Sequence, residues 1–445
     1  MRTAVILGVL AACSHHTASP PAVGDAPTTP DTGPPTYARC GDGLTADCQP
    51  ALFTGVFVPG VASDPQLAQI EAALGRPLSV IQTYRATSAT DVAYIESDLA
   101  AIFARGQVAH LNIEPAGYSA TQYAAPDQDP LATDLAAVGG AIAHALASAP
   151  AGRVIVTFGA EMNGNWTDWG CLSAAAYIAL YRAAHDAAAH ALTAAGIDAR
   201  RARWAYGPNS TSSANCGSAA GYYPGHAYVD LLGMSAYRTG TESVDAAVLT
   251  PMTDLFDALA LPAAWRRARF VALQTGSRAI AGDDRDAWIA QLVDLGTADT
   301  RVAGAIYFDA DDGPSGWSLA PADLGAQLAR APAASAQLDG VFLPHFWDVP
   351  FDHAAFPEIQ ALADARATSG CATDPPQFCP DDAITAADAM ALCARAGLAV
   401  TLADPVTEAD LAAALGMPAA PATPATRARA AQLIAPAARL VPQPL

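Results

Sequence analysis

A carboxyl group, two side-chain amides and two indoles lie within nine residues, directly after an apolar run at 154–158. They belong to Glu161, Asn163, Asn165, Trp166 and Trp169. A carboxyl group at a strand end can protonate a glycosidic oxygen, indoles offer flat faces to sugar rings, and amides bond hydroxyl groups. The spacing therefore indicates a carbohydrate site. The alternatives are a solvated carboxylate at a strand end and tryptophans that pack beneath a loop.

The second carboxyl group that glycoside hydrolysis needs is missing from its expected position. The late apolar run at 270–273 is followed by Gln274, and a neutral amide cannot form a covalent glycosyl ester. Gln274 is either an ordinary polar residue at a rim or an amide that bonds substrate. Asp309, Asp311 and Asp312 are the nearest substitutes, and one of them could act as an inverting base at roughly 6.5–9.5 Å from Glu161. Loss of activity is the favoured interpretation.

Composition excludes several classes of function. The 445 residues carry a net charge of −20, and all 23 basic residues are Arg. Without Lys there is no Schiff-base lysine and no phosphate-loop lysine, and nucleic acid is not expected as a partner. No metal or other cofactor is predicted, because the sequence has neither paired CxxC motifs nor HExxH.

The first 13 residues predict export. One Arg, a short apolar stretch and small residues precede Cys13, as in a bacterial lipoprotein signal whose Cys is acylated. The alternative is an ordinary signal peptide in which Cys13 is incidental. Residues 14–38 are rich in Pro, Thr, Ser and Ala and predict a disordered linker. We expect a lipid-anchored protein of the cell envelope, at the outer membrane, or a secreted protein.

The elements that position the carboxyl group form a regular alternation. Eight apolar runs alternate with Ala-rich helical stretches, which predicts a (β/α)8 TIM barrel over residues 39–333. The runs are 52–58, 79–83, 108–113, 154–158, 203–206, 231–235, 270–273 and 304–308, and the expected helices are 65–74, 91–105, 134–149, 173–195, 244–260, 284–295 and 321–330. A doubly wound open sheet is the alternative, but the first run lacks a Gly-rich dinucleotide turn.

Polar side chains follow the strands of this barrel, where such folds place their chemistry. They are Glu114, Glu161, Asn163, Asn209, Tyr237, Arg238, Gln274, Asp309, Asp311 and Asp312. With Trp204-Ala-Tyr-Gly-Pro-Asn209 and Tyr228-Val-Asp-Leu-Leu-Gly-Met-Ser-Ala-Tyr237, the Glu161 motif resembles glycoside hydrolase family 26, the β-mannanase-like enzymes.

The resemblance implies a role for each matched position. Glu161 is then the general acid/base, Tyr237 orients the nucleophile, and Gln274 stands at the nucleophile position. The residues implied to line the sugar subsites are Asn163, Trp166, Trp169 and Asn209. This chain departs from the family at three positions, since Ala160 replaces a His, Thr157 replaces an Arg, and Gln274 replaces the nucleophilic Glu. The retaining mechanism is therefore in doubt.

Seven cysteines remain after Cys13. In an exported protein, Cys40 with Cys48 and Cys371 with Cys379 are close enough to close small loops, and Cys171 and Cys216 follow neighbouring strands. Cys393 is left over.

Residues 334–445 resemble S-layer homology repeats and predict a small helical module. Asp348-Val349 begins the first copy, Gly370-Cys371 and Phe378-Cys379 follow, and Thr385 leads a helix. A weaker second copy ends near residue 431 and keeps Arg427, where the first copy has Ala386. The resemblance implies binding of a cell-envelope glycan, and the alternative is a stabilising helical module.

Three functions follow for testing. The first is an exported barrel that binds a β-linked polysaccharide of mannan or xylan type with hydrolysis weakened or lost. The second is an active endo-β-glycanase that uses an Asp after strand eight or the substrate itself. The third is a non-catalytic structural protein of the envelope.

Overall fold

The computed structural model describes residues 38–39, 48–49, 52–261, 270–279, 284–298, 302–310, 316–331, 343–350, 353–373 and 375–443. The predicted signal sequence with Cys13, residues 14–37 of the predicted linker, Cys40, Asp311 and Asp312 lie outside these ranges. Two short strands, β1 (Ala38–Arg39) and β2 (Cys48–Gln49), pair in parallel ahead of the barrel.

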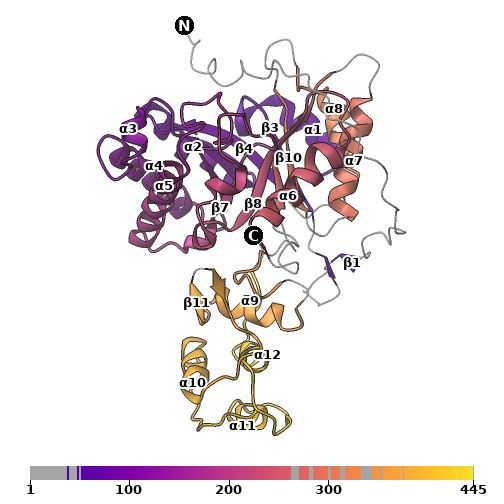
Figure 1. The fold of residues 1–445 in the computed structure, drawn as a ribbon. Coiled ribbons are helices and arrows are strands. Elements are labelled where there is room, and N and C mark those ends of the chain that lie inside the picture. The colour runs from indigo at the N-terminus through magenta and orange to yellow at the C-terminus, as the bar shows by residue number, and fades with distance from the viewer. Residues whose placement is uncertain are drawn as a thin grey trace, which may run out of the picture.

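Eight parallel strands close into a barrel in the order β10-β3-β4-β5-β6-β7-β8-β9 (Figure 1). Each of the eight predicted runs is one of these strands, so the predicted (β/α)8 barrel is confirmed. The strands are β3 (Phe53–Phe57), β4 (Val80–Ala86), β5 (Val108–Glu114), β6 (Val154–Phe158), β7 (Ala202–Tyr206), β8 (Leu231–Arg238), β9 (Phe270–Ser277) and β10 (Val302–Phe308).

The helices surround the barrel as the alternation predicts. They are α1 (Pro65–Leu74), α2 (Ala89–Ala104), α3 (Ala120–Tyr123), α4 (Leu131–Ser148), α5 (Ala174–Ala194), α6 (Thr250–Ala258), α7 (Arg285–Ala298) and α8 (Pro321–Leu328). Several of these helices begin with a side-chain cap. The hydroxyl oxygens of Ser88 and Ser173 accept hydrogen bonds from the backbone N–H groups of Asp91 and Ala176. Short 3-10 turns, η3 (Ala219–Tyr222) and η4 (His226–Tyr228), lie between β7 and β8. By length and composition, α4 alone among the described helices could cross a membrane, but it packs against α2 and α5.

The barrel interior is filled by apolar side chains near the starts of the strands, among them Phe53, Val80, Val108 and Leu231. Leu343 joins this cluster from the segment that follows the barrel. Because its partners lie near the strand starts, Leu343 closes the end of the barrel opposite the strands' C-terminal ends. The C-terminal ends are therefore the open side on which a site can form.

The C-terminal residues form a small helical unit, which Figure 1 shows below the barrel. Its elements are α9 (Phe356–Asp364), β11 (Ala372–Thr373), β12 (Pro376–Gln377), α10 (Ala386–Arg395), α11 (Glu408–Ala414) and α12 (Arg427–Ala437). The hydroxyls of Thr385 and Thr426 cap the two expected Thr-led helices, α10 and α12, and Thr407 caps α11, which was not predicted. The unit has its own apolar core, which includes Phe356, Phe378, Leu411 and Ile434.

Two predicted disulfides are confirmed, Cys171–Cys216 and Cys371–Cys379. Cys393 is buried and unpaired, as expected. Asp348, Cys371 and Cys379 lie within 4.8 Å of one another, but both cysteines are oxidised, so this group is no thiolate metal site.

Candidate active site

The polar residues named from the sequence gather at the C-terminal ends of the strands. Glu114 ends β5, Glu161 follows β6, and Asn209 follows β7 and pairs with Ser235 of β8. Tyr237 and Gln274 lie inside β8 and β9, which run further than the predicted 231–235 and 270–273. The closed barrel brings these side chains together at its one open end, formed by the C-terminal ends of the strands, which we call the mouth.

Glu161 has a backbone conformation that is unusual for its residue type. Its φ is +60°, in the left-handed region that costs a non-glycine residue roughly 1 kcal/mol or more. Its backbone N–H donates to Gly207 O at 2.9 Å, and its carbonyl accepts from Gly164 N at 2.8 Å. These bonds fix the turn that directs the side chain, and such conformations cluster at functional sites.

The Glu161 side chain is partly exposed, and a neighbouring indole holds its carboxyl group. Trp166 Nε1 donates to Glu161 Oε2 at 2.7 Å. Burial raises the pKa of Glu161, while the hydrogen bond from Trp166 works in the opposite direction. A carboxyl group with a raised pKa keeps its proton closer to neutrality, which suits a general acid.

Trp166 and Trp169 differ in position although they are three residues apart. Trp166 is partly exposed beside Glu161. Trp169 is 3% exposed, packs in the outer core of the barrel, and donates from Nε1 to Ala160 O at 2.7 Å. Trp169 therefore follows the packing alternative, and its faces are closed to a sugar ring in this structure.

Asn163 is also buried rather than open to a ligand. Its Nδ2 donates to Asn209 O at 2.8 Å and to Ser212 Oγ at 3.0 Å, and its Oδ1 accepts from Asn209 N at 2.8 Å. With 0% exposure, this amide joins the loop after β6 to the loop after β7 instead of facing the mouth. The sequence motif could not distinguish the two roles, because both require an amide at the end of a strand.

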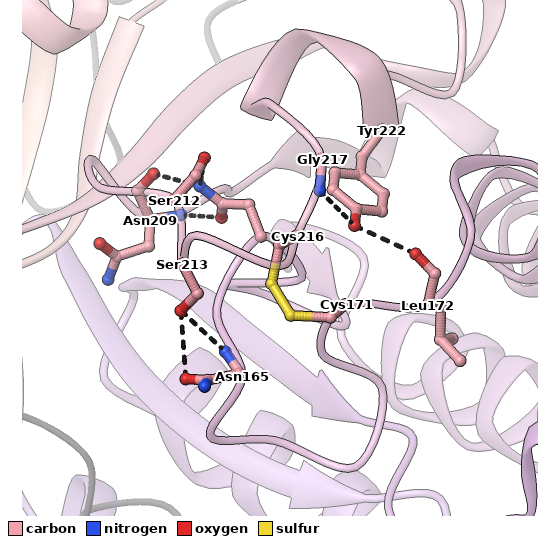
Figure 2. The surroundings of a disulfide bond; sticks show 10 residues. Asn165, Cys171, Leu172, Asn209, Ser212, Ser213, Cys216, Gly217 and Tyr222 are labelled. Atoms are coloured by element: carbon pink, nitrogen blue, oxygen red, sulfur yellow. Dashed lines mark hydrogen bonds between the residues drawn. A yellow bond between two sulfur atoms is a disulfide. The ribbon is translucent and has the colours of Figure 1, made fainter.

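Figure 2 shows how the two loops are joined near the disulfide Cys171–Cys216. Ser213 Oγ donates to Asn165 Oδ1 at 3.1 Å and accepts from Asn165 N at 3.3 Å. The Tyr222 hydroxyl donates to Leu172 O at 3.0 Å. The loop that carries Glu161 is thus braced by a covalent bond and by hydrogen bonds on both sides.

Gln274 is almost fully buried, with 6% exposure, and its amide oxygen accepts from the Tyr237 hydroxyl at 3.3 Å. The two residues assigned to this position by resemblance are therefore in contact. The group that Tyr237 contacts is neutral, so it cannot form the ester of a retaining reaction.

A second carboxyl group lies close to Glu161, on the neighbouring strand. Burial, and then the charges of Glu161 and Asp91, raise the pKa of Glu114 to about 7. The sequence placed Glu114 at the end of β5 but gave it no role. Glu114 and Glu161 are 47 positions apart in the sequence, and only the pairing of β5 with β6 brings them together.

Asp309 does not fit the role of a substitute base. It is 1% exposed, its backbone N–H donates to Phe57 O, and its Oδ1 accepts from Leu319 N at 2.8 Å. The side chain therefore holds the segment after β10 in place. Asp311 and Asp312, the other two candidates, lie outside the described residues.

An aromatic wall lines the other side of the mouth and was missed in the sequence. Phe57 stacks on Phe308 with ring centroids 4.8 Å apart, and Tyr84 meets Phe57 edge to face, also at 4.8 Å. Tyr237 lies 4.7 Å from the buried Trp317. Burial and the charges of Glu114 and Glu161 raise the pKa of Tyr84, so Tyr84 is the residue of the wall that interacts with the carboxyl pair. Phe57 and Phe308 end their strands, and that shared position was the available signal.

Thr157 and Ala160, the two other positions that depart from the family pattern, lie beneath the mouth and contact neighbouring side chains. Thr157 is fully buried and its Oγ1 lies 2.8 Å from His110 Nε2. Burial lowers the pKa of His110 to about 3, so this imidazole is neutral. Ala160 contributes its carbonyl to Trp169. Neither position offers a charge to the site.

Comparisons with known proteins agree with this arrangement in part. A sequence model described as glycosyl hydrolase family 26 matches residues 131–271. No curated protein sequence matches the chain.

Three solved structures are similar to the chain. Bacillus subtilis mannanase BCman shares 19% sequence identity, with 62% of this chain and 85% of that chain covered and a TM-score of 0.46. For the catalytic domain of the family 26 endo-beta-1,4-mannanase of Bacillus sp. JAMB-750 the identity is 15%, the coverage 68% and 91%, and the TM-score 0.49. The modular endo-beta-1,4-mannanase of Cellulomonas fimi shares 15% sequence identity, with 66% of this chain and 75% of that chain covered and a TM-score of 0.48. At these values none of the three carries information on substrate or mechanism.

The matched segment begins with α4 and ends in β9, three residues before Gln274. It contains the loops that carry Glu161 and Asn209 and the strand that carries Tyr237. Residues 131–271 are thus similar to glycosyl hydrolase family 26, and they lie within a closed (β/α)8 barrel.

Proposed function

We propose that this chain is an exported protein whose barrel binds a β-linked polysaccharide of mannan or xylan type, with retaining hydrolysis weak or lost. The observation that carries the proposal is the contact between Tyr237 and Gln274. An amide at this buried position keeps the hydrogen bond and lacks the negative charge, so the site retains its shape without a nucleophile.

Three features of Glu161 support its role as an acid/base group. Its pKa is raised by burial, Trp166 donates to its carboxyl group, and its left-handed backbone is held by Gly207. A solvated carboxylate at a strand end has no need of this combination. A protein that binds without cleaving can keep all three, because Glu161 can also hydrogen-bond a bound sugar.

The shape of the mouth supports an extended sugar ligand. Trp166 lies on one side of Glu161, and the aromatic wall of Phe57, Tyr84 and Phe308 lies on the other. Sugar rings bind to such surfaces through their apolar faces, while partly exposed amides such as Asn209 bond the hydroxyls.

Glu114 favours a second candidate function, hydrolysis that uses a different second carboxyl group. Its pKa of about 7 and its interaction with Glu161 are typical of carboxyl pairs that share catalytic work. In this alternative Glu161 protonates the leaving oxygen and Glu114 activates water. Asp309 is the weaker choice because it is buried and bonded to Leu319 N.

The proposals for the N-terminal segment and the C-terminal unit rest on the sequence. We propose that Cys13 is lipidated and anchors the protein in the cell envelope, and that the C-terminal unit binds an envelope glycan. Arg427, the residue kept in the second repeat, donates to Phe378 O at 2.7 Å and lies over the Phe378 ring. This contact favours a stabilising role for Arg427, so a scaffold role for the unit remains the competing proposal.

The test is binding and turnover measured on the same samples. The full chain is titrated with β-1,4-linked manno- and xylo-oligosaccharides by calorimetry, and products are followed by mass spectrometry. We expect saturable binding without product. Turnover by wild type that disappears in Glu114→Gln and Glu161→Gln supports the second candidate. Absence of binding to every oligosaccharide contradicts both and favours a structural protein.

A further inference from the structure

A cavity of about 520 Å³ lies at the junction between the barrel and the C-terminal unit, at the end of the barrel away from the mouth. The barrel contributes the turn after α5, with Asp198 and Arg200, and the C-terminal unit contributes His345, Arg366 and Arg395. This volume is in the range of small-ligand sites, and the cavity is open to solvent.

The junction is built as one rigid piece. The Arg200 guanidinium donates to Ala363 O at 2.7 Å and to Asp364 Oδ1 at 3.0 Å, and it also bonds Asp198. Asp364 Oδ1 lies 2.8 Å from His345 Nε2. Leu343, two residues before His345, lies in the core of the barrel. The cavity walls are therefore fixed relative to each other.

The positive charge at this junction exceeds the negative charge. Arg200 is neutralised by Asp198 and Asp364, and hydrogen bonds from Arg200 outweigh burial and hold the pKa of Asp198 below its usual range. Arg366 makes one ion pair, at 3.5 Å to the same Asp198, and its side chain is 64% exposed. Arg395 is exposed at the end of α10 and pairs with no carboxylate among the described residues.

Three further arginines interact electrostatically with the charged groups of the junction. Arg203 pairs with Asp230, while Arg153 and Arg201 donate to backbone carbonyls and influence the charges of the junction. Three arginines and one carboxylate, that of Asp198, line the cavity, in a protein whose net charge is −20. A local excess of arginine on an acidic protein attracts anions and repels other acidic surfaces.

The lining also matches a polyhydroxylated ligand. Thr193 and Ser369 supply hydroxyl groups beside the two exposed guanidiniums. Arg366 has a φ of +57°, a left-handed conformation that costs a non-glycine residue energy and fixes the start of its side chain at the cavity. Guanidinium groups bind carboxylate and phosphate oxygens in pairs, and hydroxyls extend the recognition to a sugar.

We infer that this junction cavity is a second binding site, separate from the barrel mouth, for a sugar that carries a carboxylate or a phosphate group. Arg366 and Arg395 bind the anionic group, and the hydroxyls of Thr193 and Ser369 bond the ring. The inference does not depend on the function proposed for the mouth.

The test uses the full chain and four probes, namely glucuronate, glucose 6-phosphate, inorganic phosphate and neutral glucose. Calorimetry at low salt should detect saturable binding of at least one of the two anionic sugars. Inorganic phosphate should bind with lower affinity, and glucose should give no detectable binding. The double variant Arg366→Ala, Arg395→Ala should lower the affinity on the order of tenfold or more, because each guanidinium makes charge-assisted hydrogen bonds. Both side chains are exposed, so the variant should unfold at the same temperature as wild type.

The matched control is Arg330→Ala, which removes an exposed arginine paired with Asp294 on the barrel exterior. It should leave the affinity unchanged, and so should Glu161→Gln at the mouth. The inference is overturned if neither anionic sugar binds, if inorganic phosphate binds as tightly as they do, or if the double variant binds like wild type.

Discussion

The Tyr237 hydroxyl donates to the amide oxygen of Gln274 at 3.3 Å, inside the open end of the barrel. A glutamate at the same position has an oxygen in the same place to accept this bond. Gln274 therefore occupies a site that is already shaped for a carboxylate, and the difference between the two side chains is charge rather than space.

Trp166→Phe should raise the pKa of Glu161 further. The indole N–H donates to Glu161 Oε2 at 2.7 Å and stabilises the ionised form, so its removal favours the protonated form. Carbon-13 NMR titration of the Glu carboxyl groups measures the shift. Trp169→Phe is the control, because that indole donates to Ala160 O instead. An unchanged or lower pKa in Trp166→Phe contradicts the assignment of this hydrogen bond.

Trp166→Ala and Trp169→Ala should separate binding from stability. Trp169 is 3% exposed in the core, so its truncation should cost roughly 3–5 kcal/mol in the free energy of unfolding. Trp166 is partly exposed, so its truncation should cost less stability and weaken oligosaccharide binding. Chemical denaturation and calorimetry on both variants measure the two effects. Equal stability losses, with oligosaccharide affinity retained in Trp166→Ala, run against this division of roles.

Glu114→Gln should become more stable than wild type as the pH rises. The folded pKa of about 7 lies above the ordinary value of 4.5, so the folded state binds the extra proton between these values and wild type loses stability as pH increases through them. Glu114→Gln has no carboxyl group at this position, so its free energy of unfolding does not fall for this reason as the pH rises. Its advantage should be smallest at pH 4 and reach at most about 3 kcal/mol at pH 8.

Denaturation curves at the two pH values measure the difference between Glu114→Gln and wild type. Glu96→Gln, which changes an exposed glutamate on α2, is the control and should show little dependence on pH. An advantage of Glu114→Gln that is the same at pH 4 and pH 8 means that Glu114 is not buried beside Glu161.

The double variant Cys171→Ala, Cys216→Ala should lose stability and oligosaccharide affinity together. The bond closes a loop with a sequence separation of 45, for which chain entropy predicts about 4 kcal/mol. It also joins the loop that carries Glu161 to the loop that carries Asn209 (Figure 2). The matched control is Cys371→Ala, Cys379→Ala in the C-terminal unit, which should leave binding at the mouth unchanged. Full affinity in the first variant shows that the hydrogen bonds alone hold the loop.

The sequence predicted the barrel because strand and helix alternate strictly and each strand is a short apolar run. It also predicted the Cys171–Cys216 bond, since neighbouring strands bring their loops together. The roles of individual loop residues were harder to predict. Trp166 and Trp169 have the same side chain and lie three residues apart, and only the path of the loop decides which one is buried. Strand periodicity carries no information about that path.

Contacts between distant residues were equally hidden. The charge of Glu161 raises the pKa of Glu114 because β5 lies beside β6, and Leu343 fills the barrel end from beyond the last strand. Asn163 looks like a sugar ligand in the sequence, but the backbone of Asn209 satisfies its amide. Each of these depends on the closed barrel, which no local pattern contains.

Gln274→Glu, assayed against β-1,4-manno- and xylo-oligosaccharides beside wild type, tests whether Gln274 is the reason that hydrolysis is weak or lost. We expect wild type to bind without release of product, and the variant to release shortened oligosaccharides because Tyr237 then contacts a carboxylate. The double variant Gln274→Glu, Glu161→Gln should again be inactive. Cleavage by wild type at the rate of the variant contradicts the claim that Gln274 removed the nucleophile.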